Sequence, residues 1–214
     1  MPFAVEPSEL TFALRQDCDV EFIVRDDGAL APGDTVEFQF PHTWSLLSGP
    51  SFTREFQSDD PTGEHYVEVS AEGAKFAMEV RPRQINFPEG ATRHGRHMVA
   101  TLTEGTVAAG APVTVAYRNT FAPYVSETDT AWLRVKGEAP EQAPRLIVIG
   151  GPEERMRLLV PSGVEPGQEF DVLVVSLDHF DNPSSTAHEN ETVTRCDGAV
   201  VAEGHVVGEL GLGD

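Results

Sequence analysis

The residues most able to bind a metal or to catalyse a reaction are concentrated in VSLDHFDNPSST at residues 175–186. This stretch carries two carboxylates, an imidazole and a carboxamide within five positions. Asp178, Asp181 and the side-chain carbonyl of Asn182 offer oxygen ligands of the kind that calcium prefers. Calcium takes about six to eight such ligands, so three on one loop leave the shell incomplete. The nearest carboxylates that would complete it are Glu189 and Glu191.

The same stretch also fits a turn without any metal. Asp and Asn side chains bond to nearby backbone groups, and Pro183 cannot continue the hydrogen-bond ladder of a strand. The preceding residues, DVLVVSLD, have the composition of a buried strand. We favour the turn, with calcium as the alternative and no other cofactor expected.

Two further places carry residues that can contact a ligand or a partner. In RHGRH at 93–97, His94 and Arg96 can meet an anionic group, although a solvated loop is the simpler interpretation. His94 and His97 precede a strand, where positions i and i+3 point to opposite faces, so they do not predict a shared metal. Trp44 lies in a long loop bounded by Pro and Gly and is a candidate for sugar stacking, although burial is the more common role for an isolated aromatic residue.

No catalytic residue is predicted. The chain has no GxSxG motif and no cysteine close to a histidine in sequence. Its paired acidic residues fall beside turns or in charged segments, without the apolar pocket that separates the pKa values of an acid and a base. Cys18 and Cys196 lack metal-ligand spacing and are expected to be buried thiols in different domains.

The negative net charge of the chain disfavours nucleic acids and anionic membranes as partners. The chain has 35 Asp and Glu residues against 15 Lys and Arg, a net charge of −20 over 214 residues. Nucleic-acid affinity comes largely from Lys and Arg that neutralise phosphates, so a nucleic-acid partner is not expected. An anionic membrane surface is disfavoured for the same reason. The N-terminus lacks the features of a signal peptide, so we expect a soluble, cytoplasmic protein by default, with secretion not excluded.

Alternation with a period of two predicts an all-β fold. The predicted strands are 10–14, 20–24, 35–40, 65–70, 75–80, 97–103, 113–118, 131–135, 145–151, 155–162, 169–178, 191–195 and 199–204. A glycine turn precedes an alternating strand three times, in LAPGDTVEFQF, VAAGAPVTVAY and VEPGQEFDVLV. Short strands with frequent turns favour Ig-like β-sandwiches.

We predict two such domains in tandem, at 1–138 and 144–214, joined by a linker at 139–143 that is rich in Pro, Glu and Ala. The second segment holds about five strands, whereas an Ig-like sandwich has about seven. We therefore expect this module to be truncated and the natural polypeptide to continue.

A family resemblance rests on the same stretch. VLVVSLDHFDNPSS resembles the strand, Asp, aromatic and Asn-Pro signature of bacterial Ig-like and filamin-type β-sandwich modules, and the likeness covers about 160–186. It implies that Asp178 and Asn182 are scaffold residues at the corner of a core strand. Asp181 stands where the family usually has glycine. A two-sandwich region of this kind is also similar to the accessory N-terminal region of some bacterial proteins with a PHP-type metal-dependent hydrolase-like domain.

The function expected from these observations is that of a non-catalytic accessory or binding region in a larger bacterial protein. Its partner would be a downstream domain of the same polypeptide or another protein. Two alternatives remain open. One is an N-terminal fragment of a metal-dependent hydrolase whose catalytic domain lies beyond residue 214, and the other is a calcium-assisted carbohydrate-binding module.

Overall fold

The computed structural model describes residues 3–44, 56–86, 92–159, 162–163, 173–186, 191–194 and 200–204. Within these ranges the chain forms β-strands and one short 3-10 helix, η1 (His42–Trp44), which confirms the all-β prediction. The strands are β1 (Ala4–Glu6), β2 (Glu9–Ala13), β3 (Asp17–Arg25), β4 (Thr35–Gln39), β5 (Tyr66–Ser70), β6 (Lys75–Asn86), β7 (Thr92–Glu104), β8 (Val113–Phe121), β9 (Glu127–Thr130), β10 (Trp132–Val135), β11 (Arg145–Ile149), β12 (Arg155–Leu159), β13 (Leu173–Leu177), β14 (Glu191–Thr194) and β15 (Val200–Gly204). Among the described residues no helix is long and apolar enough to cross a membrane.

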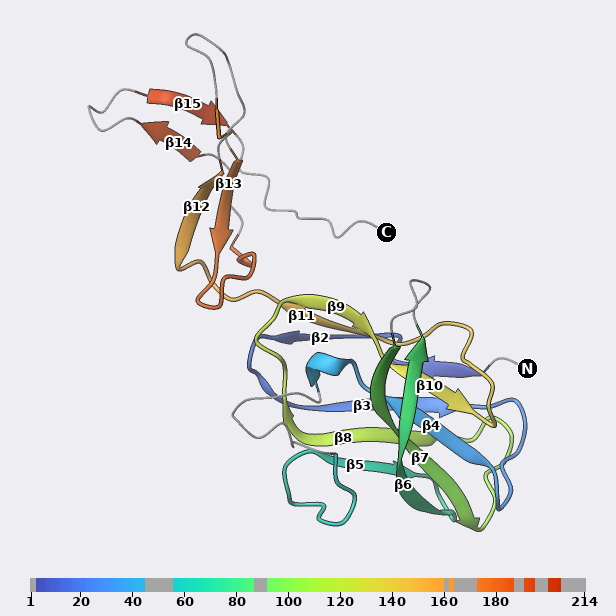
Figure 1. Ribbon diagram of the computed structural model, residues 1–214. Helices are drawn as coiled ribbons and strands as arrows, with labels where there is room; N and C mark the ends of the chain where they lie inside the picture. Colours follow the sequence, from blue (N-terminus) through green and yellow to red (C-terminus); the bar gives the residue numbers. More distant parts are fainter. Residues whose placement is uncertain are drawn as a thin grey trace. The chain divides into compact units, whose positions relative to one another are not determined.

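Two four-stranded antiparallel sheets build the first part of the chain (Figure 1). Their strand orders are β1-β3-β8-β5 and β10-β4-β7-β6. In β3 every second residue is buried, at Val20, Phe22 and Val24, because successive side chains of a strand point to opposite faces. The ring of Phe40, just after β4, lies 6.4 Å from that of Phe22 and 4.9 Å from that of Tyr117 in β8. Rings from the two sheets therefore meet in a common core.

Glycine turns precede β4 and β8, as the repeated pattern predicts. Gly33 and Gly110 have φ values of 100° and 74°, in the left-handed region that glycine adopts without a steric penalty. The third copy of the pattern, at 164–174, falls mostly outside the described residues.

The prediction of a loop at RHGRH is wrong. The structure places 93–97 inside β7, where the backbone of His94 pairs with Gln84 and that of Arg96 pairs with Pro82 of β6. Pro82 interrupts the alternating pattern of the partner strand β6, which is why β6 was predicted only as 75–80. It is tolerated here because β6 is an edge strand of its sheet, where a missing N–H breaks no ladder on the outer side.

Contacts divide the chain into two compact units. The first unit comprises Met1–Pro123 and Thr128–Ile147, and the second comprises Tyr124–Glu127 and Val148–Asp214. This boundary falls after the predicted linker, because β11 is hydrogen-bonded between β2 and β9 in a third sheet. The described strands of the second unit form two antiparallel ribbons, β12-β13 and β14-β15.

Candidate functional site

The corner that follows β13 is held by the side chain of Asp178, which is 1% exposed. Its Oδ1 accepts hydrogen bonds from the backbone amides of Phe180 (2.8 Å) and Asn182 (2.9 Å). Its Oδ2 accepts one from the amide of Gly151 at 2.9 Å. Burial alone would raise the pKa of Asp178, but these backbone hydrogen bonds, with one from the Asn182 side chain, outweigh it and lower the pKa.

Asn182 ties this corner to a segment far away in sequence. Its Nδ2 donates to the backbone carbonyl of Tyr124 at 2.9 Å, and its Oδ1 accepts from the amide of Ser126 at 2.9 Å. The predicted turn, with Asp and Asn bonded to backbone groups, is therefore present.

Asp181 takes a different role from Asp178. Its φ is 67°, in the left-handed region that glycine adopts without a steric penalty. Its carboxylate lies 2.7 Å from Nη2 of Arg155 and 3.4 Å from Nη2 of Arg157. Within the described part of the chain, no three His, Cys, Asp or Glu side chains gather where they could hold a metal ion. Glu189 and the side chain of Glu191 lie outside it, so the calcium alternative stays a prediction.

Trp44 does not offer a sugar-stacking surface. The residue is 2% exposed, and its ring packs edge-on against Phe12 with centroids 5.1 Å apart. The favoured burial is what the structure shows, and the alternative of an exposed platform at Trp44 is wrong. The side chains of His94 and Arg96 are outside the described residues, so their predicted contact with a ligand or a partner is untested.

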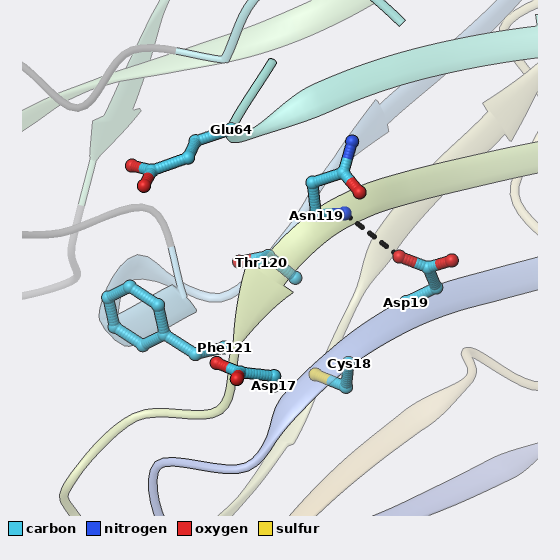
Figure 2. A pocket seen from close by; sticks show the side chains of 7 residues that line it. All are labelled: Asp17, Cys18, Asp19, Glu64, Asn119, Thr120 and Phe121. Carbon is cyan, nitrogen blue, oxygen red and sulfur yellow. Dashed lines mark hydrogen bonds between the residues drawn. The ribbon is translucent and has the colours of Figure 1, made fainter. Parts of the chain in front are cut away.

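A pocket lies in the first unit, at the end of the β3-β8-β5 sheet (Figure 2). It is open and encloses about 520 Å³. The residues that line it are Asp17, Cys18, Asp19, Glu64, Asn119, Thr120 and Phe121. Three of these carry carboxylates and none is basic. Figure 2 shows the carboxylates of Glu64 and Asp19 on opposite sides of Asn119 and Thr120.

An irregularity in the sheet creates this pocket. The register between β3 and β8 shifts between Cys18 and Val20, and Asn119 opposite them has a φ of 52°. Asparagine tolerates this left-handed conformation better than most residues. The backbone N–H of Asn119 donates to Oδ1 of Asp19 at 2.8 Å, as the dashed line in Figure 2 shows. A bulge of this kind bends a strand and redirects its side chains.

Two more residues with positive φ surround the same end of the sheet. Arg15 (57°) places its guanidinium 4.2 Å above the ring of Phe121. His65 (60°) donates its backbone N–H to the carbonyl of Asn119 at 3.2 Å. Residues other than glycine rarely adopt positive φ, so their concentration here means that surrounding contacts enforce the shape of the pocket.

A buried polar chain lies beneath the pocket. The Tyr117 hydroxyl donates to the carbonyl of Trp44 at 3.1 Å, which leaves its oxygen to accept from Nδ1 of His65 at 2.5 Å. Oγ1 of Thr120, which lines the pocket, is 3.5 Å from the same nitrogen. His65 and Thr120 are 6% and 3% exposed, and Thr120 is the member of this chain that lines the pocket, so the chain links the pocket wall to the core.

The thiol in the pocket is not activated. Burial, together with the negative charges of Asp19 and Asp17, raises the pKa of Cys18 to about 12. The reactive form of cysteine is the thiolate, so Cys18 is unsuited to nucleophilic catalysis at neutral pH. Arg118 partly neutralises the negative charge of Asp19, because its Nη1 lies 3.7 Å from that carboxylate. The guanidinium lies closer to Glu21 and Glu68.

No motif in the sequence predicts this pocket. Its residues come from the start of β3, the turn before β5 and the end of β8, about 100 positions apart. The one local signal is DCD at 17–19, where two acidic residues open a strand with a thiol between them. Nothing in the sequence marks Asn119 as the position of a bulge.

No family model, curated protein or solved structure matches the chain. The resemblance to Ig-like and filamin-type modules, and that to the region preceding PHP-type domains, therefore stay predictions.

Proposed function

We propose that the chain is a non-catalytic binding region made of Ig-like β-sandwich modules, of the accessory kind that a larger bacterial protein carries. The observation that carries this proposal is the pocket at the end of the β3-β8-β5 sheet. Its volume of about 520 Å³ lies within the range of about 300–1,000 Å³ that is usual for small-molecule sites.

The groups in the pocket suit recognition better than chemistry. Its carboxylates accept hydrogen bonds, the Asn119 carboxamide both donates and accepts, and the Cys18 thiol is held protonated. Nucleophilic catalysis needs an activated nucleophile beside a base, and Cys18 is shifted away from activation.

The charge of the lining selects the ligand class. Asp17, Asp19 and Glu64 are exposed carboxylates, and the whole chain has a net charge of −20. A ligand that brings positive charge and several N–H donors is favoured, whereas an anion is repelled. A small polyamine has these properties, so spermidine is a suitable probe.

Exposed apolar side chains of the second unit support the accessory role. Large hydrophobic residues that are 43–52% exposed include Met156, Leu158, Leu159 and Leu173, all on the β12-β13 ribbon. Apolar surface of this kind often marks a contact with another protein surface. A downstream domain or a protein partner is therefore part of the proposal.

A thermal-shift titration tests the binding role. We expect spermidine to raise the Tm of the first unit and glutarate, an anion of similar length, to leave it unchanged at equal ionic strength. A ligand at 100 times its Kd stabilises the folded state by about 2.7 kcal/mol. Removing one charge about 4 Å from a bound cation costs about 1 kcal/mol in water, so Asp17→Asn should weaken binding about fivefold.

Asp27→Asn is the matched control. Asp27 is also exposed and its replacement changes the net charge equally, but it follows the opposite end of β3. If both variants weaken spermidine binding to the same extent, the polyamine senses only the overall charge and the pocket is not a specific site. If no donor-rich cation binds, the proposal for this pocket is overturned.

A further inference from the structure

Two aromatic rings of the second unit stand half-exposed beside each other. Tyr124 is 49% exposed and Phe180 is 46% exposed. Their ring centroids are 6.2 Å apart, with the planes tilted by 44°. Burying aromatic rings is strongly favourable, so two adjacent exposed rings offer a partner a large gain in free energy on contact.

The backbone beneath both rings is fixed. The carbonyl of Tyr124 accepts from Asn182, and the amide of Phe180 donates to Asp178, which is itself buried. The amide of Ser126 adds a third bond, to Oδ1 of Asn182. The rings therefore stand on a hydrogen-bonded corner, and presenting them to a partner requires little ordering of the backbone.

The net charge of the second unit favours a positively charged partner. The second unit, Tyr124–Glu127 with Val148–Asp214, contains 14 acidic residues against three arginines and no lysine, a net charge of −11 with histidine neutral. Two of those arginines, Arg155 and Arg157, pair with Asp181. The faces of aromatic rings also attract cations, so the two rings and the net charge of the unit both favour a positively charged partner.

The distance between the rings suits a partner segment in an extended conformation. In an extended strand, side chains at i and i+2 lie on the same side about 6.6–6.8 Å apart. That distance is close to the 6.2 Å between the ring centroids. We infer that Tyr124 and Phe180 form a docking surface for an extended basic segment of another protein, with Arg or Lys at alternate positions, one cation over each ring.

The test uses three capped pentapeptides and the full chain. The probe is Gly-Arg-Gly-Arg-Gly, the spacing control is Gly-Arg-Arg-Gly-Gly, and the charge control is Gly-Glu-Gly-Glu-Gly. The ring protons of Tyr124 and Phe180 are followed by NMR during each titration. We expect the probe to shift both rings, the adjacent-arginine peptide to bind about two- to fivefold more weakly, and the acidic peptide to have no effect.

Replacing either ring with leucine keeps the apolar bulk and removes the aromatic face. Tyr124→Leu and Phe180→Leu should each weaken binding of the probe about two- to fivefold, whereas Ile149→Ala, at an exposed residue of β11, should leave it unchanged. Equal binding by the leucine variants, equal binding of the acidic peptide, or ring shifts caused by maltohexaose and not by the probe would each overturn the inference. In the Asp17→Asn variant the probe should shift the ring protons of Tyr124 and Phe180 as it does in the wild type, which separates this surface from the proposed pocket.

Discussion

Two regions of this chain are rich in Asp and Asn, and their side chains do different things. At the corner after β13, both carboxylate oxygens of Asp178 accept backbone amides of the chain itself. At the pocket, Asp17, Asp19 and Glu64 are exposed to solvent around an open cavity. The compact cluster in the sequence is a scaffold, and the dispersed set lines a pocket. Hydrogen-bond partners, not local density of polar residues, distinguish the two.

Breaking the corner should have the largest effect on stability. Asp178→Ala removes the acceptor for three backbone amides, one buried and two part-buried, and each group left unsatisfied costs up to about 1–3 kcal/mol. We expect the second unit to lose about 3 kcal/mol or more of its unfolding free energy, as measured by urea denaturation. Asp181→Asn is the control: it removes only exposed ion pairs, worth about 0–1 kcal/mol. Equal losses for the two variants would contradict the scaffold role of Asp178.

Removing a hydroxyl from the buried polar chain behind the pocket should have an intermediate effect on the unfolding free energy. Tyr117→Phe keeps the ring in the core but removes the hydroxyl that bonds to Trp44 and His65. Leaving these buried partners unsatisfied should cost about 1–3 kcal/mol of unfolding free energy. Denaturation monitored by tryptophan fluorescence measures this change. A variant as stable as the wild type would mean that the polar chain does not stabilise the fold.

The contribution of Asp178 should depend on pH. Its pKa is lowered in the folded state, so its contribution is complete above the unfolded value of about 3.9 and is lost as the pH falls through the folded pKa. The difference in unfolding free energy between the wild type and Asp178→Asn should therefore be constant from about pH 5 to 7 and shrink below about pH 4. Urea titrations across this range would contradict the account if the difference grew on acidification.

The smallest effect on stability is expected at the rim of the pocket. Asp17→Asn should change the unfolding free energy by no more than about 0.5 kcal/mol, because Asp17 is an exposed side chain. Urea denaturation at pH 7 provides the measurement. A loss comparable to that of Asp178→Ala would show that the pocket carboxylates, like the corner, belong to the scaffold.

The strands were the predictable part of the fold. Alternation in VEFIV and VTVAYR identified β3 and β8 because one face of each strand is buried in a core. The short strands β1 and β9 were missed because β1 has only three residues and β9, ETDT, contains no apolar residue to alternate with polar ones. The pocket was not predictable, because a register shift beside Asn119 brings together residues about 100 positions apart. The aromatic position Phe180 was part of the stretch singled out in the sequence, but its exposure and its contact with Tyr124, 56 residues away, were not predicted.

Backbone amide NMR tests the central claim, that the pocket binds a small donor-rich cation, most directly. Titration with spermidine should shift the amides of Asp17, Cys18, Asn119 and Thr120 in a saturable manner, and Asp17→Asn should weaken this response about fivefold while Asp27→Asn does not. Shifts spread evenly over the acidic surface, or none at the ends of β3 and β8, would contradict the claim.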